Sequence, residues 1–320
     1  MAVHVGEHRI SLDKKEKDAS INFVSHAHSD HTGGVKKSSK VLCSEITRDL
    51  IETRVGFQVN MAEKPESVEL IDSGHMLGSK QLYAELGNGL SMVYTGDYQM
   101  QKSPVAESIE VRNADILIID STYPFPNIVF DEKEEVITSM QHYIQNKGNV
   151  GSILFGAYSM GKAQELIRIC NDIGIVPLVD ESVARISDVY SKHGIGLEFV
   201  TQGIGSKIED GCFDSQVWIS SMNGFDDVRG MVSQMGRKIF TAVATGFARM
   251  HKFNTDVQFT LSDHADFKQA INYIECCNPK FIYTRGSGSY AFAKNLKAAG
   301  YRAEELKPDF DARNILLNCL

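Results

Sequence analysis

The residues best suited to chemistry lie in one heptapeptide, Ser-His-Ala-His-Ser-Asp-His, at positions 25–31. It places three imidazoles and a carboxylate side by side, those of His26, His28, His31 and Asp30. Imidazole nitrogen and carboxylate oxygen are ligands that suit zinc and related divalent metals. Because the chain holds only ten histidines in 320 residues, a polar loop that gathers three of them by chance is the weaker interpretation. The segment predicts a metal centre, with two of the histidines at one ion and the Asp-His pair at a second.

The flanking sequence indicates how this segment is held. Residues 21–24 are mostly apolar and follow a polar run, which is typical of a strand. Gly33, Gly34 and a further polar run come after the histidines. We therefore expect the ligands to lie on a loop between a strand end and a helix N-terminus.

Two later motifs carry the same residue types. Gly-His-Met-Leu-Gly-Ser at 74–79 and Tyr-Thr-Gly-Asp at 94–97 each follow an apolar or alternating run, as ligands at strand ends should. With these motifs the chain resembles the metallo-β-lactamase superfamily. The resemblance implies that His75 completes the first metal site, that Asp97 bridges the two metals, and that Ser79 supports the His75 loop beside the substrate.

The second half of the chain resembles the β-CASP branch of that superfamily, the branch that cleaves nucleic acids. Ile-Leu-Ile-Ile-Asp-Ser-Thr-Tyr at 116–123 is similar to its first signature, and Leu-Ser-Asp-His-Ala-Asp-Phe at 261–267 to its second. Gly-Lys-Ala-Gln-Glu-Leu at 161–166 is similar to an early helix of its inserted domain. The resemblance implies that His264 binds the scissile phosphate or protonates the leaving oxygen. Asp120 would orient that imidazole and favour its charged form, although a helix or turn cap is the alternative for an aspartate in Asp-Ser-Thr. The catalytic residues implied are Asp30, Asp97, Asp120 and His264.

One position departs from the family pattern. RNA-cleaving members usually carry apolar-His-Gly near the C-terminus, and that histidine binds the second metal, but this chain has Ile-Tyr-Thr-Arg-Gly at 282–286. Arg285 keeps its charge and offers no lone pair, so it cannot bind a cation. We therefore expect one firmly bound zinc and a weaker second metal. Arg285 either contacts a phosphate oxygen of the substrate or is a surface residue that ends a strand. The predicted substrate-contacting residues are Ser79, Lys162, His264 and Arg285.

Composition narrows the class of protein. The net charge of −8 and the pI of about 5.7 argue against a surface that is positively charged throughout and binds phosphate everywhere. They do not argue against a nucleic-acid site in a cleft. No run of 18 apolar residues predicts a membrane span, and the N-terminus lacks the pattern of a signal peptide. The six cysteines show no zinc-ribbon spacing, which favours reduced thiols in the cytoplasm.

The organisation of the chain changes along its length. Residues 1–125 show many short strand patterns, and residues 126–246 alternate helical stretches (134–145, 162–171, 183–193) with apolar strands (151–155, 175–179, 216–220). Such alternation is typical of a parallel α/β sheet. Residues 267–276 and 290–299 predict two more helices around a strand at 281–284. The fold expected is an α/β one, an αββα metallo-β-lactamase sandwich of residues 1–125 and 247–320 interrupted by an inserted β-CASP domain of residues 126–246.

The function implied is a metal-dependent phosphodiesterase that cleaves RNA, of the mRNA 3′-end-processing or exoribonuclease type. An Artemis-like DNA nuclease is the nearest alternative, because such relatives also lack the third-signature histidine. A partly degenerate, non-catalytic subunit of a processing complex is a second alternative, and a small-molecule hydrolase a third. The expected partner is RNA, with DNA as the other candidate, and the chain is expected to act as a homodimer or as a subunit of a processing complex.

Overall fold

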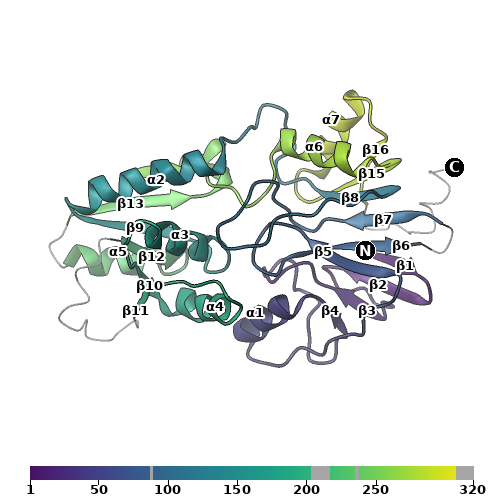
Figure 1. Cartoon of the computed structure of the whole chain (residues 1–320), viewed down its shortest axis with the longest axis horizontal. Helices are drawn as coiled ribbons and strands as arrows, with labels where there is room; N and C mark the ends of the chain where they lie inside the picture. Colours follow the sequence, from purple (N-terminus) through teal and green to yellow (C-terminus); the bar gives the residue numbers. More distant parts are fainter. Residues whose placement is uncertain (87–88, 203–216, 235–237, 308–320) are drawn as a thin grey trace. The chain divides into compact units, whose positions relative to one another are not determined.

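The computed structural model describes residues 1–86, 89–202, 217–234 and 238–307 of the 320-residue chain. The chain forms two compact units (Figure 1). The first unit consists of Met1–Val129 and His264–Leu320, and the second of Phe130–Asp263. Within the described residues, no helix has the length and apolar character needed to cross a membrane.

The first unit contains two sheets. The smaller has the strand order β1-β2-β3-β4, and the larger has the order β16-β15-β8-β7-β6-β5. The strands of the smaller sheet are β1 (Ala2–Val5), β2 (His8–Leu12), β3 (Ile21–Phe23) and β4 (Val41–Leu42). Those of the larger are β5 (Val68–Asp72), β6 (Lys80–Glu85), β7 (Ser91–Tyr94), β8 (Ile116–Asp120), β15 (Phe281–Arg285) and β16 (Ala303–Glu305).

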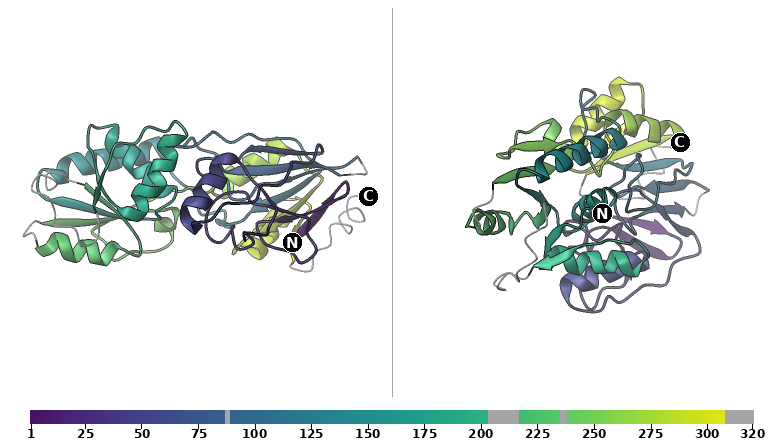
Figure 2. Two further views of the ribbon diagram at one scale, coloured as in Figure 1. Left: turned by 90° about the horizontal axis from the view of Figure 1, so that it is seen from below. Right: turned by 60° about the vertical axis from the view of Figure 1, so that its left-hand side comes forward.

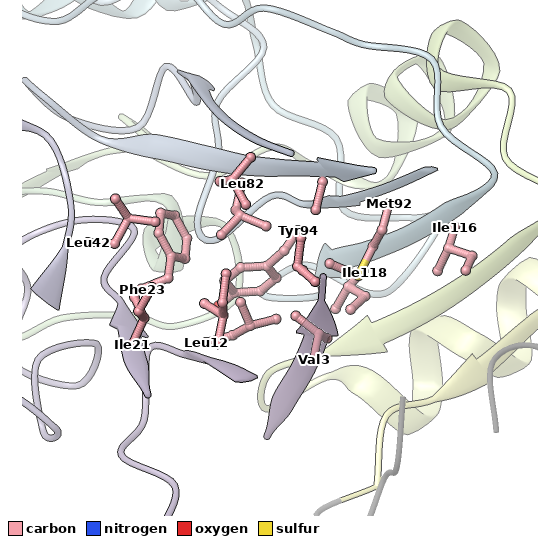
Figure 3. Packing of buried hydrophobic residues seen from close by; sticks show 14 of the residues in the cluster. Val3, Leu12, Ile21, Phe23, Leu42, Leu82, Met92, Tyr94, Ile116 and Ile118 are labelled. Carbon is pink, nitrogen blue, oxygen red and sulfur yellow. The ribbon is translucent and has the colours of Figure 1, made fainter. Parts of the chain in front are cut away.

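The core of the first unit lies between these sheets (Figure 3). Leu12 and Phe23 of the smaller sheet pack in one buried cluster with Tyr94, Ile116 and Ile118 of the larger. The rings of Phe23 and Tyr94 meet edge to face, with centroids 6.1 Å apart. Since side chains alternate across a strand, every second residue of β7 and β8 enters this core.

The remaining residues of the same strands face a second core. Val93, Leu117 and Ile119 pack against Tyr273 and Phe292. The last two residues belong to α6 (Phe267–Cys277) and α7 (Ser289–Ala298). Because β8 is buried on both faces, its sequence is a continuous apolar run rather than an alternating one. That run ends at Asp120, which places a carboxylate at the edge of the sheet.

Helix α6 begins where its sequence provides a cap. The side chain of Asp266 accepts a hydrogen bond of 2.8 Å from the backbone N–H of Gln269, the arrangement that satisfies a free amide at a helix start. Asn278 ends the helix in the left-handed conformation, with φ of 51°. The cap at Asp266 also fixes the end of the short segment that carries His264.

The second unit is a six-stranded parallel sheet with the order β11-β10-β12-β9-β13-β14. Right-handed crossovers place helices on both faces of such a sheet. Through α3 and α4 the chain moves across the sheet from β9 to β10 and then to β11. Through α5 it moves the other way, from β12 to β13, and Figure 2 shows α5 on the other side of the strands. The strands are β9 (Ser152–Ala157), β10 (Leu178–Asp180), β11 (Val200–Gln202), β12 (Val217–Ser221), β13 (Ile239–Ala244) and β14 (Val257–Phe259). The helices are α2 (Lys133–Gly148), α3 (Lys162–Asn171), α4 (Glu181–Lys192) and α5 (Phe225–Gln234), with the 3-10 turn η2 at Gly246–Arg249.

Two sequence-based expectations differ from this structure. The inserted domain was expected at 126–246, whereas the second unit runs to Asp263, because β14 pairs with β13 and completes its sheet. No helix follows the histidine segment directly: residues 24–40 form turns that lead to β4, and the first helix, α1 (Glu45–Val55), comes later, after its cap at Ser44. The consecutive Gly33 and Gly34 disfavour a helix at that point. The α/β fold class is as expected, and α3 has the predicted bounds.

Candidate metal centre

Four side chains of the first unit converge on one point. Ring nitrogens of His26, His28 and His75 and a carboxylate oxygen of Asp97 all lie within 4.8 Å of one another. His28 Nδ1 is 3.0 Å from His26 Nε2 and 3.2 Å from His75 Nε2. Asp97 Oδ2 is 3.5 Å from His26 Nε2 and 3.8 Å from His75 Nε2. Ligands of a tetrahedral zinc ion, with bonds of about 2.0–2.1 Å, stand ~3.3 Å apart, so both the spacing and the donor types fit a divalent metal such as zinc.

At His26 and Asp97, electrostatics favours the protonation states that a metal needs. Burial lowers the pKa of His26 well below its usual value, which keeps the ring neutral. Although burial opposes it, the neighbouring His31 and His264 hold the pKa of Asp97 well below the usual value for a carboxyl. Neutral imidazole and ionised carboxylate are the forms that bind metal ions.

The ligands come from three loops that approach one another closely. His26 and His28 follow β3, His75 lies between β5 and β6, and Asp97 follows β7. Glycine makes the approach possible: Gly74 has a φ of 74°, and a Cβ built there would stand 2.4 Å from the backbone oxygen of Gln99. At Gly96, with a φ of 56°, it would stand 2.5 Å from Ser25 Cβ. A side chain at either glycine would force the ligand loops apart.

Asp13 belongs to this group of side chains, although sequence reasoning missed it. It is fully buried, and its Oδ2 lies 2.7 Å from His31 Nδ1. The same carboxylate accepts hydrogen bonds from the backbone N–H and hydroxyl of Ser25, at 2.7 and 2.8 Å, and from the hydroxyl of Tyr94. A carboxylate behind an imidazole fixes the ring orientation. Here it directs His31 Nε2 toward Asp97 Oδ2, 3.4 Å away. The one available signal was its place at the end of a strand, which it shares with the ligands.

A second group of side chains shares Asp97. Ligand atoms of Asp97, Asp120 and His264 lie within 4.8 Å of one another. His264 Nδ1 is 3.1 Å from Asp120 Oδ2, and His264 Nε2 is 4.0 Å from Asp97 Oδ2. Burial and the charge of Asp97 raise the pKa of Asp120. The hydroxyl of Thr122 donates to the Asp120 carboxylate, so Asp120 holds both a local turn and the imidazole. The two interpretations of Asp120, as a turn cap and as a partner of His264, both describe this structure.

Arg285 and Asp30 lie differently from the other expected residues. Arg285 ends β15, but its side chain is only 21% exposed and points inward, with Nη1 3.5 Å from Asp13 Oδ2. Its guanidinium carbon is 5.0 Å from the centre of the Tyr94 ring. The interpretation of Arg285 as a surface residue is therefore wrong. The side chain of Asp30 is 78% exposed, and its Oδ2 is 3.6 Å from His31 Nε2, at the rim of the site.

Ser79 and Lys162 have structural partners. The hydroxyl of Ser79 is buried, accepts a hydrogen bond of 2.8 Å from Ser73 Oγ, and supports the turn that follows His75. Lys162 lies in the second unit, where its buried ammonium is 2.6 Å from Glu165 Oε2 and 2.6 Å from Asp263 Oδ1. Contact of either residue with substrate stays a prediction.

Comparison with known proteins places this site in context. No protein-family model matches the chain. It is 27% identical over 310 residues to a "Probable DNA ligase" of Opitutus terrae, covering 90% of this chain and 29% of the relative. It is 28% identical over 195 residues to an "RNase J-like protein" of Methanocaldococcus jannaschii, covering 50% of this chain and 45% of the relative. Its homologues belong to the β-CASP metallo-β-lactamase nuclease group. The chain spans less than half the length of both relatives named here.

Two further similarities concern the family and the fold. The chain is 30% identical over 143 residues to an "Uncharacterized protein in lig 3'region" of Acidianus ambivalens, covering 99% of that protein and 44% of this chain, and belongs to the same family. A crystal structure of a protein of unknown function from Enterococcus faecalis V583 matches with a TM-score of 0.59 at 14% identity, covering 92% of this chain and 81% of that one. The second match concerns the fold alone. A β-CASP metallo-β-lactamase fold agrees with two facing sheets and a separate parallel-sheet unit.

Proposed function

We propose that this β-CASP protein is a zinc-dependent phosphodiesterase that cleaves polynucleotides, and that its substrate is DNA. The observation that carries the proposal is the convergence of three imidazoles and Asp97 beside the His264–Asp120 pair. A non-catalytic scaffold would not need these ligand loops to be held together by glycines.

The residues divide the chemistry between them. His26, His28, His75 and Asp97 would hold the firmly bound metal, and Asp30 and His31 with Asp97 would form a weaker second site. Bound metal would supply Lewis-acid polarisation of a phosphoryl oxygen and activation of a water molecule. Asp120 lies at Nδ1 of His264, and Nε2 faces Asp97 Oδ2, 4.0 Å away. From this position Nε2 would donate a proton to the leaving oxygen or a hydrogen bond to a phosphate oxygen. The inward-facing Arg285 acts on this site through Asp13, and direct phosphate contact is the alternative role proposed for it.

The choice of DNA over RNA rests on the extent of the similarities. The probable DNA ligase aligns with 90% of this chain, whereas the RNase J-like protein aligns with 50% of it. RNA is the second candidate substrate, because one of the relatives is named an RNase J-like protein. Action in the cytoplasm, and assembly as a homodimer or with a processing complex, are further proposals that follow from the sequence.

A cleavage assay tests the proposal. End-labelled single strands of DNA and RNA with identical sequence are incubated with protein stripped of metal and then supplied with zinc. We expect cleavage of DNA that requires added metal and is lost in His75→Ala and His264→Ala, with His193→Ala as the control histidine. The product ladder distinguishes removal of terminal nucleotides from internal cuts. Preferential cleavage of RNA would support the second candidate, and full activity without metal would overturn the proposal.

A further inference from the structure

Two exposed aromatic side chains follow the strands that end at Asp120 and at Arg285. Phe125, in the loop after β8, is 46% exposed, and Tyr290, in the first turn of α7, is 71% exposed. A single exposed aromatic residue needs no explanation. Two of them on neighbouring loops at the same edge of a sheet call for one.

The two loops are in direct contact. A Cβ built on Gly288 would stand 2.3 Å from the backbone oxygen of Ser121 and 2.6 Å from Pro124 Cγ, so only glycine allows this approach. The side-chain amide of Asn295 in α7 donates a hydrogen bond of 2.8 Å to the backbone oxygen of Pro124. Phe125 is the next residue after Pro124, and Tyr290 lies two residues after Gly288, so both rings are carried by one packed surface.

The same surface is tied to the reacting groups. Ser121 Oγ donates a hydrogen bond of 2.6 Å to the backbone oxygen of Arg285, and a Cβ on Gly286 would stand 3.2 Å from Asp120 Oδ1. The ring of Tyr123 meets that of His264 edge to face, with centroids 6.2 Å apart. The backbone segments that carry Phe125 and Tyr290 are therefore fixed relative to the Asp120–His264 pair by packing.

These loops carry no charged side chain of their own, and the carboxylate of Glu305 lies beside them, where it accepts a hydrogen bond of 2.8 Å from Ser289 Oγ. Residues 121–129 and 286–293 contain no acidic side chain, in a chain whose net charge is −8. A phosphate backbone would therefore meet no carboxylate on these two segments. An exposed aromatic ring can stack on any base, because every base has a flat π-face.

We propose that Phe125 and Tyr290 form a base-stacking subsite that holds an unpaired nucleotide next to the scissile phosphate. This deepens the proposed function, on which it rests, by naming the substrate class as single-stranded nucleic acid or the frayed end of a duplex. A base inside a duplex is stacked on its neighbours and is not available to these rings.

An abasic scan tests the subsite. Binding of a phosphorothioate-linked single-stranded DNA, which resists cleavage, is followed by fluorescence anisotropy while one abasic residue is moved along the strand. With the wild-type protein we expect a position at which loss of the base weakens binding by about 5- to 100-fold. Phe125→Ala and Tyr290→Ala should bind the intact strand more weakly and lose that dependence, while Tyr290→Phe should retain it. Tyr158→Ala is the matched control, because Tyr158 is an aromatic residue of the second unit that is 63% exposed.

The outcomes separate the two proposals. If the alanine variants keep the wild-type dependence on the base, or if the wild type shows none at any position, the subsite is refuted while DNA cleavage still supports the proposed function. If the wild type neither binds nor cleaves a polynucleotide with metal present, the proposed function itself fails. The melting temperature of each variant is compared with that of the wild type. An unchanged melting temperature shows that a change in binding is not caused by misfolding.

Discussion

Replacement of Asp13 by asparagine should weaken both the second metal site and the first unit. Asparagine keeps the shape of the side chain but removes its charge. Its carbonyl oxygen can still accept the bond from the backbone N–H of Ser25, now made to Oδ1 at 2.7 Å. Its NH₂ group would then face the donors that now converge on Oδ2, among them His31 Nδ1 at 2.7 Å.

The size of the effect follows from which donors can adapt. The hydroxyls of Ser25 and Tyr94 can rotate and accept a hydrogen bond instead, so their loss is small. The His31 ring nitrogen loses its acceptor, which costs about 1–3 kcal/mol for a buried polar group. The guanidinium of Arg285, 3.5 Å from Oδ2, loses its counter-charge, and its partial exposure reduces that cost. We expect a total of about 2–4 kcal/mol in the free energy of unfolding and a lower melting temperature by about 5–10 °C.

Metal binding should change in the same variant. Loss of a carboxylate behind a metal-binding imidazole typically weakens metal affinity about 10- to 100-fold. Competition with a chelator, followed by elemental analysis, should show the weaker metal released first and the metal at His26, His28 and His75 retained. Asp18→Asn is the control, since the side chain of Asp18 is 75% exposed. Wild-type metal stoichiometry together with an unchanged melting temperature in Asp13→Asn would refute the role assigned to this network.

Three further predictions concern other parts of the chain. Arg285→His should raise the occupancy of the second metal in elemental analysis, because it replaces a cation by a possible ligand, whereas Arg285→Met should not; equal stoichiometry in both would exclude the missing histidine as the cause of weak binding. Lys162→Met should destabilise the second unit by up to about 3–5 kcal/mol in denaturant unfolding, because it removes one of the two cations beside the carboxylates of Glu165 and Asp263. The other is Lys133, 2.9 Å from Glu165 and 4.0 Å from Asp263, and unchanged stability would show that Lys133 suffices. The pKa of Asp180 is lowered, because hydrogen bonds from Ser182, Ser221 and Val183 outweigh the opposing effect of burial. The contribution of Asp180 to stability is therefore present above the pKa of an unfolded aspartate, about 3.9. It is lost as the pH falls through the lower folded value. Asp180→Asn should flatten the acid side of the stability profile of the second unit, and an unchanged profile would contradict this.

The candidate metal ligands share one feature of the sequence, which is that they follow strand ends. An apolar run that ends in His, Asp or Gly predicts a strand and the point where it stops, and strands of one sheet bring such points to one edge. That argument needs no knowledge of which strands are neighbours. It agrees with the position of His75, Asp97 and Asp120 after strands of the larger sheet, whereas their grouping with His26, which follows a strand of the smaller sheet, came from the family resemblance.

The same reasoning could not predict where a side chain points across the sheets. Asp13 ends β2, but nothing in its local sequence shows that Ser25, His31 and Tyr94 converge on it from other strands. The limit of the second unit was missed for a similar reason. Residues 257–259 join its sheet only because β13 offers them a parallel edge, and that pairing is a tertiary contact.

Arg285 shows how this limit affects function. From the sequence, an arginine in place of a metal-binding histidine suggested either a phosphate contact or a surface position. In the structure it lies against Asp13 and the Tyr94 ring. It therefore belongs to the same group of donors around the buried Asp13 carboxylate as His31. The permanent positive charge of Arg285 compensates the negative charge of the buried Asp13 carboxylate. With a neutral histidine at position 285, only His31 and a bound metal would compensate that negative charge. The substitution therefore changes the charge balance behind the second metal site as well as the number of its ligands, and the metal content of Arg285→His compared with Arg285→Met measures the two effects separately.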